Sequence, residues 1–317
     1  MDAQRTLRRQ ISCVGIGLHS GNKVNLTLKP APADSGIRFR RTDVGGPGGH
    51  EVPATVQHLA GIQLATGLSR NEVSVETVEH LLAALTSCGV DNVLVELNSP
   101  EVPIMDGSAA AFVAAIDQAD IVTQSAARRF IQVLKPVQVR IGDSFGELRP
   151  HASGFRAEVE IDFANPVIGR QNFSLDLSPE SFRREISRAR TFGCMNDTAK
   201  LWSAGFALGA SFENTVVFDE TRLLNTEGLR YSDECARHKV LDVVGDLALA
   251  GLPLLGAYRS VRGGHKLNHA VLSALMADRS AWRVVEAESA RRSRGHIEAG
   301  AGMAGGMVAP AYGPDVS

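Results

Sequence analysis

Aromatic residues are scarce in this sequence: Phe, Trp and Tyr together make up 5% of its 317 residues. That is too few for a surface on which many nucleic-acid bases stack. Lys and Arg total 33 while Asp and Glu total 35, so the net charge of -2 gives no bulk attraction to nucleic acid. We therefore expect no nucleic-acid partner and a function that resides in a local site.

Paired cysteines and long apolar runs are also missing. The four cysteines form no C-x-x-C pair, which excludes a zinc ribbon and a thioredoxin motif, and their number does not indicate a disulfide scaffold. No segment reaches the roughly 18 to 20 apolar residues of a membrane helix. The apolar stretch 11–18 follows three arginines, but it contains Ser12 and two glycines and lacks a signal-peptide cleavage site. We expect a soluble protein in a reducing cytoplasm, with 11–18 as its first strand.

The composition is otherwise near the globular average, with 44% hydrophobic and 21% charged residues. Alternating apolar residues predict strands within 1–30 and at 37–41, 93–97, 130–133, 137–141, 155–163 and 254–261. Helical spacing predicts helices at 77–88, from Asp106 or Ser108 to 119, and at 179–188, 232–250 and 268–277. For the first of these helices, Thr77 is the expected N-cap and Gly89 the expected terminator.

The order of these elements indicates the fold class. Each half of the chain has strands first and then helices around a strand, which is typical of two α+β units of similar plan. We predict domains at 1–125 and 130–282, joined by a linker at 125–129. The glycine-rich stretch 45–49 is expected to be a flexible tip, because no Lys-Ser or Lys-Thr follows it as in a phosphate loop. The aperiodic, Gly- and Ala-rich end, 291–317, is predicted to be disordered.

The predicted helix 232–250 carries three polar residues among Val and Leu. Asp242 follows His238 by four residues and therefore lies on the same face, and Asp246 lies one further turn along. One interpretation is a His-x-x-x-Asp metal pair supported by Asp246. The alternative is a polar stripe that faces solvent.

Glu79 and His80 lie at the start of the predicted helix 77–88. With His238 and Asp242, His80 would complete two nitrogen ligands and one oxygen ligand, as in a catalytic zinc site with an open fourth position. Glu79 would then lie beside the metal, where a general base for water acts. Alone, Glu-His in a first helical turn is also explained by capping and the helix dipole.

His265 is a further candidate. It follows two glycines, which allow close backbone approach, and its neighbours Arg262 and Lys266 suit an anionic ligand. His19 likewise lies between glycines. The alternative for both is an ordinary histidine in a turn or at a helix start.

Six ordered motifs carry a resemblance to a known family. They are GIGLHSG (15–21), VETVEHLLAAL (75–85), PIMDGSAAAF (103–112), SRARTFG (187–193), RHKVLDVVGDL (237–247) and GGHKLN (263–268). Together they resemble the UDP-3-O-acyl-N-acetylglucosamine deacetylases, zinc hydrolases that commit a UDP-sugar to lipid A and hence lipopolysaccharide biosynthesis. The similarity runs from about residue 4 to about residue 283.

The resemblance implies a cytoplasmic enzyme that hydrolyses the N-acetyl group of UDP-3-O-acyl-N-acetylglucosamine with Zn²⁺ as cofactor. It implies two similar α+β domains that each layer helices against a sheet, with the active site between them. One insert in each domain would shape the site. The second, near 194–222, would form an apolar passage for the acyl chain, and it contains Trp202, Phe206, Leu208, Val216 and Val217. We expect a monomer.

The resemblance also assigns catalytic roles. The implied zinc ligands are His80, His238 and Asp242, and the implied general base is Glu79. His265 would be the cation that stabilises the oxyanion and protonates the leaving amine. Asp246 would keep the proton affinity of His265 high, and Thr191 would donate to the oxyanion.

Three further residues are implied to contact the substrate. Lys239, on a different helix face from the adjacent ligand His238, would meet the sugar-diphosphate part. Phe192 would pack on the sugar or the acyl chain. Arg262 stands where a lysine is common, and its forked guanidinium would grip phosphate differently. Ile62 and Gly67 stand where the family more often has threonines, which changes the expected lining of the first insert.

Two other functions remain open at this point. A small-molecule kinase of similar layered architecture would need a phosphate-binding glycine loop, which 45–49 does not provide. A non-catalytic binding module on the same scaffold should have lost Glu79 or a metal ligand, and none is lost. The sequence also has no H-E-x-x-H, G-x-S-x-G or strand-linked G-x-G-x-x-G motif.

Overall fold

The computed structural model describes residues 3–44, 51–62 and 64–287, which belong to one compact unit. The predicted flexible tip 45–49 and the predicted disordered tail 291–317 lie outside the described residues. The described residues form six α-helices and several sheets, which confirms the α+β class. The division into domains at 125–130 stays a prediction.

The N-terminal half forms a five-stranded sheet. Its strands, in spatial order, are β2 (Ile11–Ile16), β3 (Lys23–Pro30), β9 (Val93–Leu97), β4 (Ile37–Arg41) and β5 (Glu51–Pro53). In β3 the alternating side chains of Val24, Leu26 and Leu28 are fully buried, as their spacing predicts. The stretch 11–18 gives the second strand and not the first, because β1 (Ala3–Leu7) precedes it.

The C-terminal half forms a seven-stranded sheet. Five strands follow the order β12 (Val137–Ile141), β13 (Ser144–Arg149), β18 (Leu254–Val261), β11 (Arg129–Val133) and β19 (Trp282–Glu286). The other two are β14 (Phe155–Asp162), which pairs with β18, and β15 (Arg170–Leu177), which pairs with β14. The predicted strand 254–261 is confirmed.

The predicted linker at 125–129 is wrong. Residues 125–127 belong to β10 (Ile121–Ala127), and β11 begins at Arg129. β10 pairs antiparallel with β1, whose residues are more than a hundred positions earlier in the chain. This pairing satisfies the backbone hydrogen bonds of a segment whose polar composition by itself suggests a loop.

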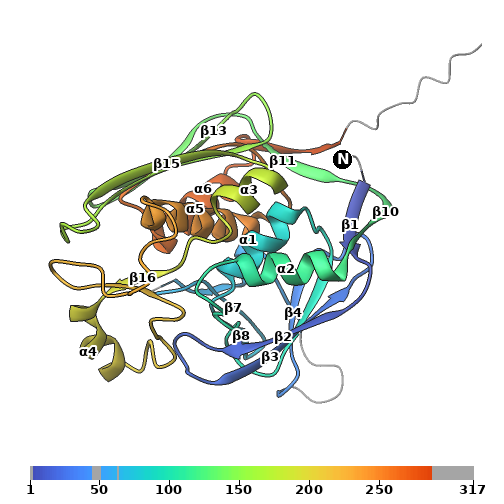
Figure 1. Ribbon diagram of the computed structural model, residues 1–317. Helices are drawn as coiled ribbons and strands as arrows, with labels where there is room; N and C mark the ends of the chain where they lie inside the picture. The colour runs from blue at the N-terminus through green and yellow to red at the C-terminus, as the bar shows by residue number, and fades with distance from the viewer. Residues whose placement is uncertain (1–2, 45–50, 63, 288–317) are drawn as a thin grey trace, which may run out of the picture. The chain divides into compact units, whose positions relative to one another are not determined.

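Helices fill the space between the two sheets (Figure 1). They are α1 (Glu79–Cys88), α2 (Ala110–Ala119), α3 (Pro179–Glu185), α5 (Glu234–Leu247) and α6 (His265–Ala277). α2 contacts β2 of the N-terminal sheet, while α5 and α6 contact β14 and β13 of the C-terminal sheet. None of the described helices is both long and apolar enough to cross a membrane.

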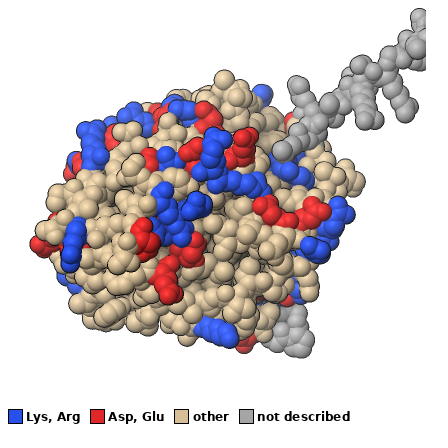
Figure 2. All heavy atoms as spheres, in the orientation of Figure 1, with Lys and Arg blue, Asp and Glu red and all other residues tan. Residues whose placement is uncertain are grey.

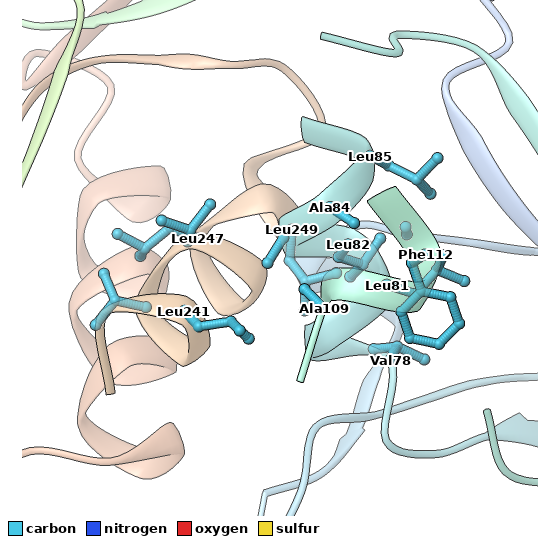
Figure 3. Packing of buried hydrophobic residues seen from close by; sticks show 14 of the residues in the cluster. Val78, Leu81, Leu82, Ala84, Leu85, Ala109, Phe112, Leu241, Leu247 and Leu249 are labelled. Atoms are coloured by element: carbon cyan, nitrogen blue, oxygen red, sulfur yellow. The ribbon is translucent and has the colours of Figure 1, made fainter. Parts of the chain in front are cut away.

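α1 lies at the centre of this helical layer. Its side chains Leu81, Leu82 and Leu85 are fully buried. Figure 3 shows Phe112 of α2 on one side of α1 and Leu241 of α5 on the other. A helix that is apolar on all sides is buried on all sides, so the polar residues at its N-terminus are also held inside the protein.

Smaller elements extend from the two sheets. The N-terminal half contains a three-stranded sheet of β6 (Leu59–Gly61), β7 (Gly67–Arg70) and β8 (Val73–Val75), preceded by the 3₁₀ helix η1 (Val56–His58). The C-terminal half contains β16 (Phe192–Cys194), α4 (Met195–Ser203) and β17 (Val216–Phe218), with β16 and β17 parallel. In Figure 1, α4 lies apart from the central helical layer.

The ends of the helices differ from prediction in places. Thr77 is not the N-cap of α1: Val78 holds that position, and Thr77 has a left-handed φ of 57° and donates its hydroxyl to Glu101 at 3.0 Å. Gly89 ends α1 with a φ of 75°, as predicted. α6 begins at His265, three residues before the predicted start. α5 ends at Leu247 and a 3₁₀ turn, η2 (Ala248–Ala250), follows it.

Lys and Arg are interspersed with Asp and Glu on the face shown in Figure 2. This distribution agrees with the near-zero net charge of the sequence.

Candidate active site and metal centre

Three ligand atoms converge where α1 and α5 pack together. The Asp242 Oδ1 atom lies 3.3 Å from His238 Nε2 and 3.7 Å from His80 Nε2. The two imidazole rings meet edge to face, with centroids 4.9 Å apart. All three side chains are at most 4% exposed, so the alternative of a solvent-facing stripe on this helix is wrong.

The protonation states of the cluster fit a divalent metal ion. The Nδ1 atom of His238 lies 3.0 Å from the carbonyl oxygen of Ala189, which can only accept, so Nε2 keeps its lone pair. Burial, assisted by the charge of His238, lowers the pKa of His80 to about 3.

The carboxylate completes the donor set. Burial alone would raise the pKa of Asp242, but Lys239 and His238 outweigh it and hold that pKa well below its usual range. Neutral imidazole and ionised carboxylate are the forms that bind metal. Two nitrogens and one oxygen from three side chains match a catalytic zinc site with an open position.

Glu79 lies next to the cluster at the first position of α1. The backbone N–H of Thr66 donates to its Oε2 atom at 3.0 Å, and its Oε1 atom lies 3.8 Å from His265 Nε2. Burial raises the pKa of Glu79 to about 7; His265 opposes this shift, whereas Asp246 and Asp242 add to it. A carboxylate with a pKa near 7 can exchange a proton at neutral pH, as a general base must.

His265 forms an ion pair with Asp246 behind the cavity. Its Nδ1 atom lies 2.8 Å from Asp246 Oδ2. Burial would lower the pKa of His265, but Asp246, joined by Glu79, outweighs it and raises that pKa to about 10. The imidazole is therefore a cation at neutral pH, with Nδ1–H donated to Asp246 and Nε2–H turned toward Glu79.

Four residues absent from the predicted site hold Asp246 in place. Thr66 donates its hydroxyl to Oδ1 at 2.5 Å, and Asn268 donates its amide to Oδ2 at 2.8 Å. Tyr258 donates in turn to the Asn268 side-chain oxygen at 2.7 Å, and His269 Nε2 lies 2.9 Å from the Thr66 hydroxyl. Asp246, His265 and His269 are close enough to hold an ion, but we interpret them as a hydrogen-bonded network because both Asp246 oxygens already accept hydrogen bonds.

Sequence signals for these four residues were uneven. Asn268 and His269 follow His265 by three and four residues on α6, the same spacing that identified Asp242 from His238. Thr66 comes from the loop before β7 and has no local signal. Tyr258 lies in β18 and reaches the network only because β18 passes beneath α6.

The site opens into a polar cavity of about 110 Å³. Its wall contains Leu18, His19, Leu64, Ala65, Thr77, Glu79, His80, Ile104, Thr191, Phe192, His238, Lys239, Asp242 and His265. The structure thus brings both metal-ligand helices, the loop around His19 and β16 to one place.

Lys239 lies on the same side of α5 as the ligand Asp242, and not on a separate face. It donates to Asp242 Oδ2 at 2.8 Å, because the two residues are three positions apart. Its Nζ atom also lies 5.4 Å from the centre of the Phe192 ring. Lys239 therefore both neutralises part of the carboxylate charge and lines the cavity.

Thr191 is positioned by its neighbours in the chain. Its backbone N–H donates to Gly107 at 2.8 Å, and its carbonyl oxygen accepts from Val216 at 2.8 Å. The preceding residue, Arg190, is 2% exposed and donates from Nε to Glu234 at 2.9 Å. Neither Arg190 nor Glu234 was predicted from the sequence to support the site.

Arg262 is the predicted site residue that the structure leaves apart. It is exposed, has a left-handed φ of 54° and pairs with Asp162 of β14. It does not belong to the cavity wall. His19, in contrast, belongs to that wall; its backbone N–H donates to Glu101 at 2.8 Å.

Comparisons with known proteins agree with this geometry. The family model described as UDP-3-O-acyl N-acetylglycosamine deacetylase matches residues 4–277. Relatives named UDP-3-O-acyl-N-acetylglucosamine deacetylase from Brucella melitensis biotype 2, Brucella ovis and Brucella abortus are each 49% identical over 285 residues. The matches cover 90% of this chain and 99% of each relative. The chain therefore belongs to the UDP-3-O-acyl N-acetylglycosamine deacetylase family.

Proposed function

We propose that this chain is a zinc-dependent amidohydrolase that removes the N-acetyl group of UDP-3-O-acyl-N-acetylglucosamine. The products are acetate and UDP-3-O-acyl-glucosamine, and the reaction is the committed step of lipid A biosynthesis. The observation that carries the proposal is the juxtaposition of Glu79 and His265 beside a buried ligand cluster: Oε1 and Nε2 lie 3.8 Å apart. Amide hydrolysis needs such a base and such an acid on one cavity.

His80, His238 and Asp242 would hold the zinc ion. When bound, zinc supplies a Lewis acid that lowers the pKa of water and polarises the acetamide carbonyl. The remaining steps belong to the side chains. Glu79 accepts a proton from water as the water oxygen bonds to the acetyl carbon.

The oxyanion and the leaving group are served by the other groups on the cavity. The His265 cation and the Thr191 hydroxyl stabilise the negative oxygen. His265 then gives its Nε2 proton to the sugar nitrogen as the carbon–nitrogen bond breaks. Asp246 keeps His265 protonated and oriented until this transfer.

The sugar nucleotide is assigned to the rim of the cavity. Lys239 and Phe192 both belong to the wall, so the ammonium group can meet phosphate while the ring packs on the sugar. Arg262 lies outside this wall, and we assign it a phosphate contact only at the outer end of the substrate.

The acyl chain is assigned to the segment 194–222. Three of its large apolar side chains are strongly exposed: Trp202, Leu208 and Phe212 are 57%, 55% and 49% accessible. The backbone N–H of Leu208 donates to His19 at 3.1 Å, which ties this segment to the cavity wall. Exposed apolar side chains beside a polar cavity suit a substrate with a polar head and an apolar chain.

The wider context of the proposal is a cytoplasmic monomer with domains at 1–125 and 130–282. The five-stranded sheet uses strands between residues 11 and 97, and the seven-stranded sheet uses strands between residues 129 and 286. All four cysteines are free, which suits a reducing compartment.

The test compares acetate release from the acylated substrate and from UDP-N-acetylglucosamine, which lacks the 3-O-acyl chain. Each buried methylene contributes roughly 0.8 kcal/mol, so we expect kcat/KM to fall by several orders of magnitude without the chain. Leu208→Glu should reduce turnover of the acylated substrate more than that of the short one. Leu134→Glu, at an exposed apolar position outside the segment, is the matched control. Equal efficiency on both substrates would refute the substrate assignment.

A further inference from the structure

A second cavity, larger than the catalytic one, lies elsewhere in the helical layer. Its volume is about 370 Å³, within the size range of small-molecule sites. The C-terminal part of α1, including Ser87, contributes to its wall. At 1.5 Å rise per residue, Ser87 lies roughly 12 Å along α1 from Glu79. None of the ten predicted site residues belongs to this wall.

The wall of this cavity is mainly apolar. Its large apolar side chains include Phe130, Phe155, Leu177, Val244, Leu247 and Leu254. They come from β11, β14, β15, α5 and β18. A ligand that fills the cavity must therefore present an apolar body to them.

The charged groups of the wall do not balance. Among the described residues, it contains three arginines and two aspartates, a net charge of +1. Arg128 donates from Nε to Asp91 at 2.8 Å, and Arg129 donates from Nη2 to Asp34 at 2.7 Å. Both acids are thus engaged with other arginines, and Arg5 is left without a carboxylate partner in the described part of the chain.

The Arg5 guanidinium has unused donors on one edge. Its Nε and Nη2 atoms are buried and have no hydrogen-bond partner among the described residues. The Ser87 hydroxyl is in the same state. Buried donors without a partner are rare in folded proteins and call for an explanation such as a ligand or an ion.

Packing keeps Arg5 in this place. The guanidinium lies over Gly89 so closely that a Cβ there would overlap it. The C-terminal end of α1 offers it partial negative charge. That end provides no hydrogen-bond acceptor to the side chain, and the Asp91 Oδ2 atom accepts instead from the Arg5 backbone at 2.9 Å.

We propose that this cavity is a binding site for a small amphipathic monoanion, namely a carboxylate attached to a compact apolar body. The Nε and Nη2 atoms form the edge of a guanidinium that holds a carboxylate through two parallel hydrogen bonds. The Ser87 hydroxyl adds a third donor, and the apolar wall receives the body of the ligand. The single excess positive charge favours one negative charge over the two of a phosphate monoester.

Titration calorimetry with three rigid probes tests this site on the full-length zinc-loaded protein. The probes are 2-naphthoate, 2-naphthol and 2-naphthylamine, which share an apolar body and differ in the polar group. We expect one equivalent of 2-naphthoate to bind, and the other two to bind about tenfold more weakly or not at all. Equal binding of all three probes would overturn the proposal.

Variants locate the carboxylate. Arg5→Gln should weaken 2-naphthoate binding at least about tenfold, and Ser87→Ala, a milder change, should weaken it several-fold. Arg9→Gln is the matched control, because Arg9 is exposed and donates to the Gln118 carbonyl outside this wall. The melting temperature of each variant reports whether it folds. Unchanged affinity in folded Arg5→Gln and Ser87→Ala, or competition by the acylated sugar nucleotide, would refute the site.

Discussion

Gly245 of α5 packs directly against the backbone of Glu79 in α1, and a Cβ at position 245 would overlap the Glu79 carbonyl oxygen. This contact sets the distance between the two helices at the point where they carry their functional groups. His80 follows Glu79 on one side, and Asp242 and Asp246 flank Gly245 on the other. The metal cluster and the proton-transfer pair therefore depend on a residue that has no side chain.

Gly245→Ala is expected to separate α1 from α5. Overpacking of this kind costs about 1–3 kcal/mol of stability, and moving the helices apart should also weaken metal binding. Zinc content after dialysis, together with the melting temperature, measures both effects. Gly193→Ala is the control, because an added Cβ at Gly193 meets no atom within 4 Å. If Gly245→Ala retained full zinc and activity, the close packing would not be what positions the site.

The pH profile of kcat/KM should have two limbs. Activity should rise through a pKa near 7 as Glu79 loses its proton, and fall near pH 10 as the His265 cation loses its own. Asp246→Asn removes the charge that raises the pKa of His265, so the alkaline limb should move to lower pH. An alkaline limb that stays in place in this variant would exclude His265 as the acid.

The same ion pair makes a linked contribution to stability. Because folding raises the pKa of His265 above its ordinary 6.5 to about 10, the contribution is full below pH 6.5. It is lost as the pH rises through the folded value. Asp246→Asn should therefore destabilise the protein more at pH 6 than at pH 10.5, measured by urea unfolding at both values.

The buried pair of Arg190 and Glu234 is expected to hold the Thr191 segment. Both side chains are at most 2% exposed, and Glu234 also accepts from the Arg190 backbone at 3.0 Å. Glu234→Gln would leave a buried guanidinium without its counter-charge, which costs about 3–5 kcal/mol. The exposed pair of Arg8 and Asp120 is the control, and Asp120→Asn should cost at most about 1 kcal/mol. Equal losses in urea unfolding would contradict this role.

Removing a metal ligand should abolish tight zinc binding. Both His238→Ala and Asp242→Ala delete one of three protein ligands, and the second also leaves Lys239 without its 2.8 Å partner. His58→Ala removes a histidine from outside the cavity wall and should retain about one equivalent of zinc by elemental analysis. Full zinc content in either ligand variant would refute the assignment.

Local patterns in the sequence predicted much of the fold and the site. The alternation in 254–261 and the spacing of His238 and Asp242 depend on residues a few positions apart, so they can be read without tertiary structure. The ordered motifs then supplied His80, Glu79 and His265. The same short-range logic would have identified His269, four residues after His265.

Features that depend on distant partners could not be predicted. β10 is a strand only because β1 pairs with it, and Thr66 joins the site only because its loop folds over α1. Thr77 has the residue type of an N-cap, but a left-handed backbone turns its hydroxyl to Glu101. Lys239 appeared to lie on a separate face because its neighbour His238 was the reference, whereas its contact is with Asp242.

Acetate release by Glu79→Gln tests the central claim most directly. The account predicts that this variant keeps about one equivalent of zinc and its affinity for UDP-3-O-acyl-N-acetylglucosamine. Its turnover should fall by roughly 10²- to 10⁴-fold, the usual contribution of a general base. An unchanged rate of acetate release in the zinc-loaded variant would contradict the account.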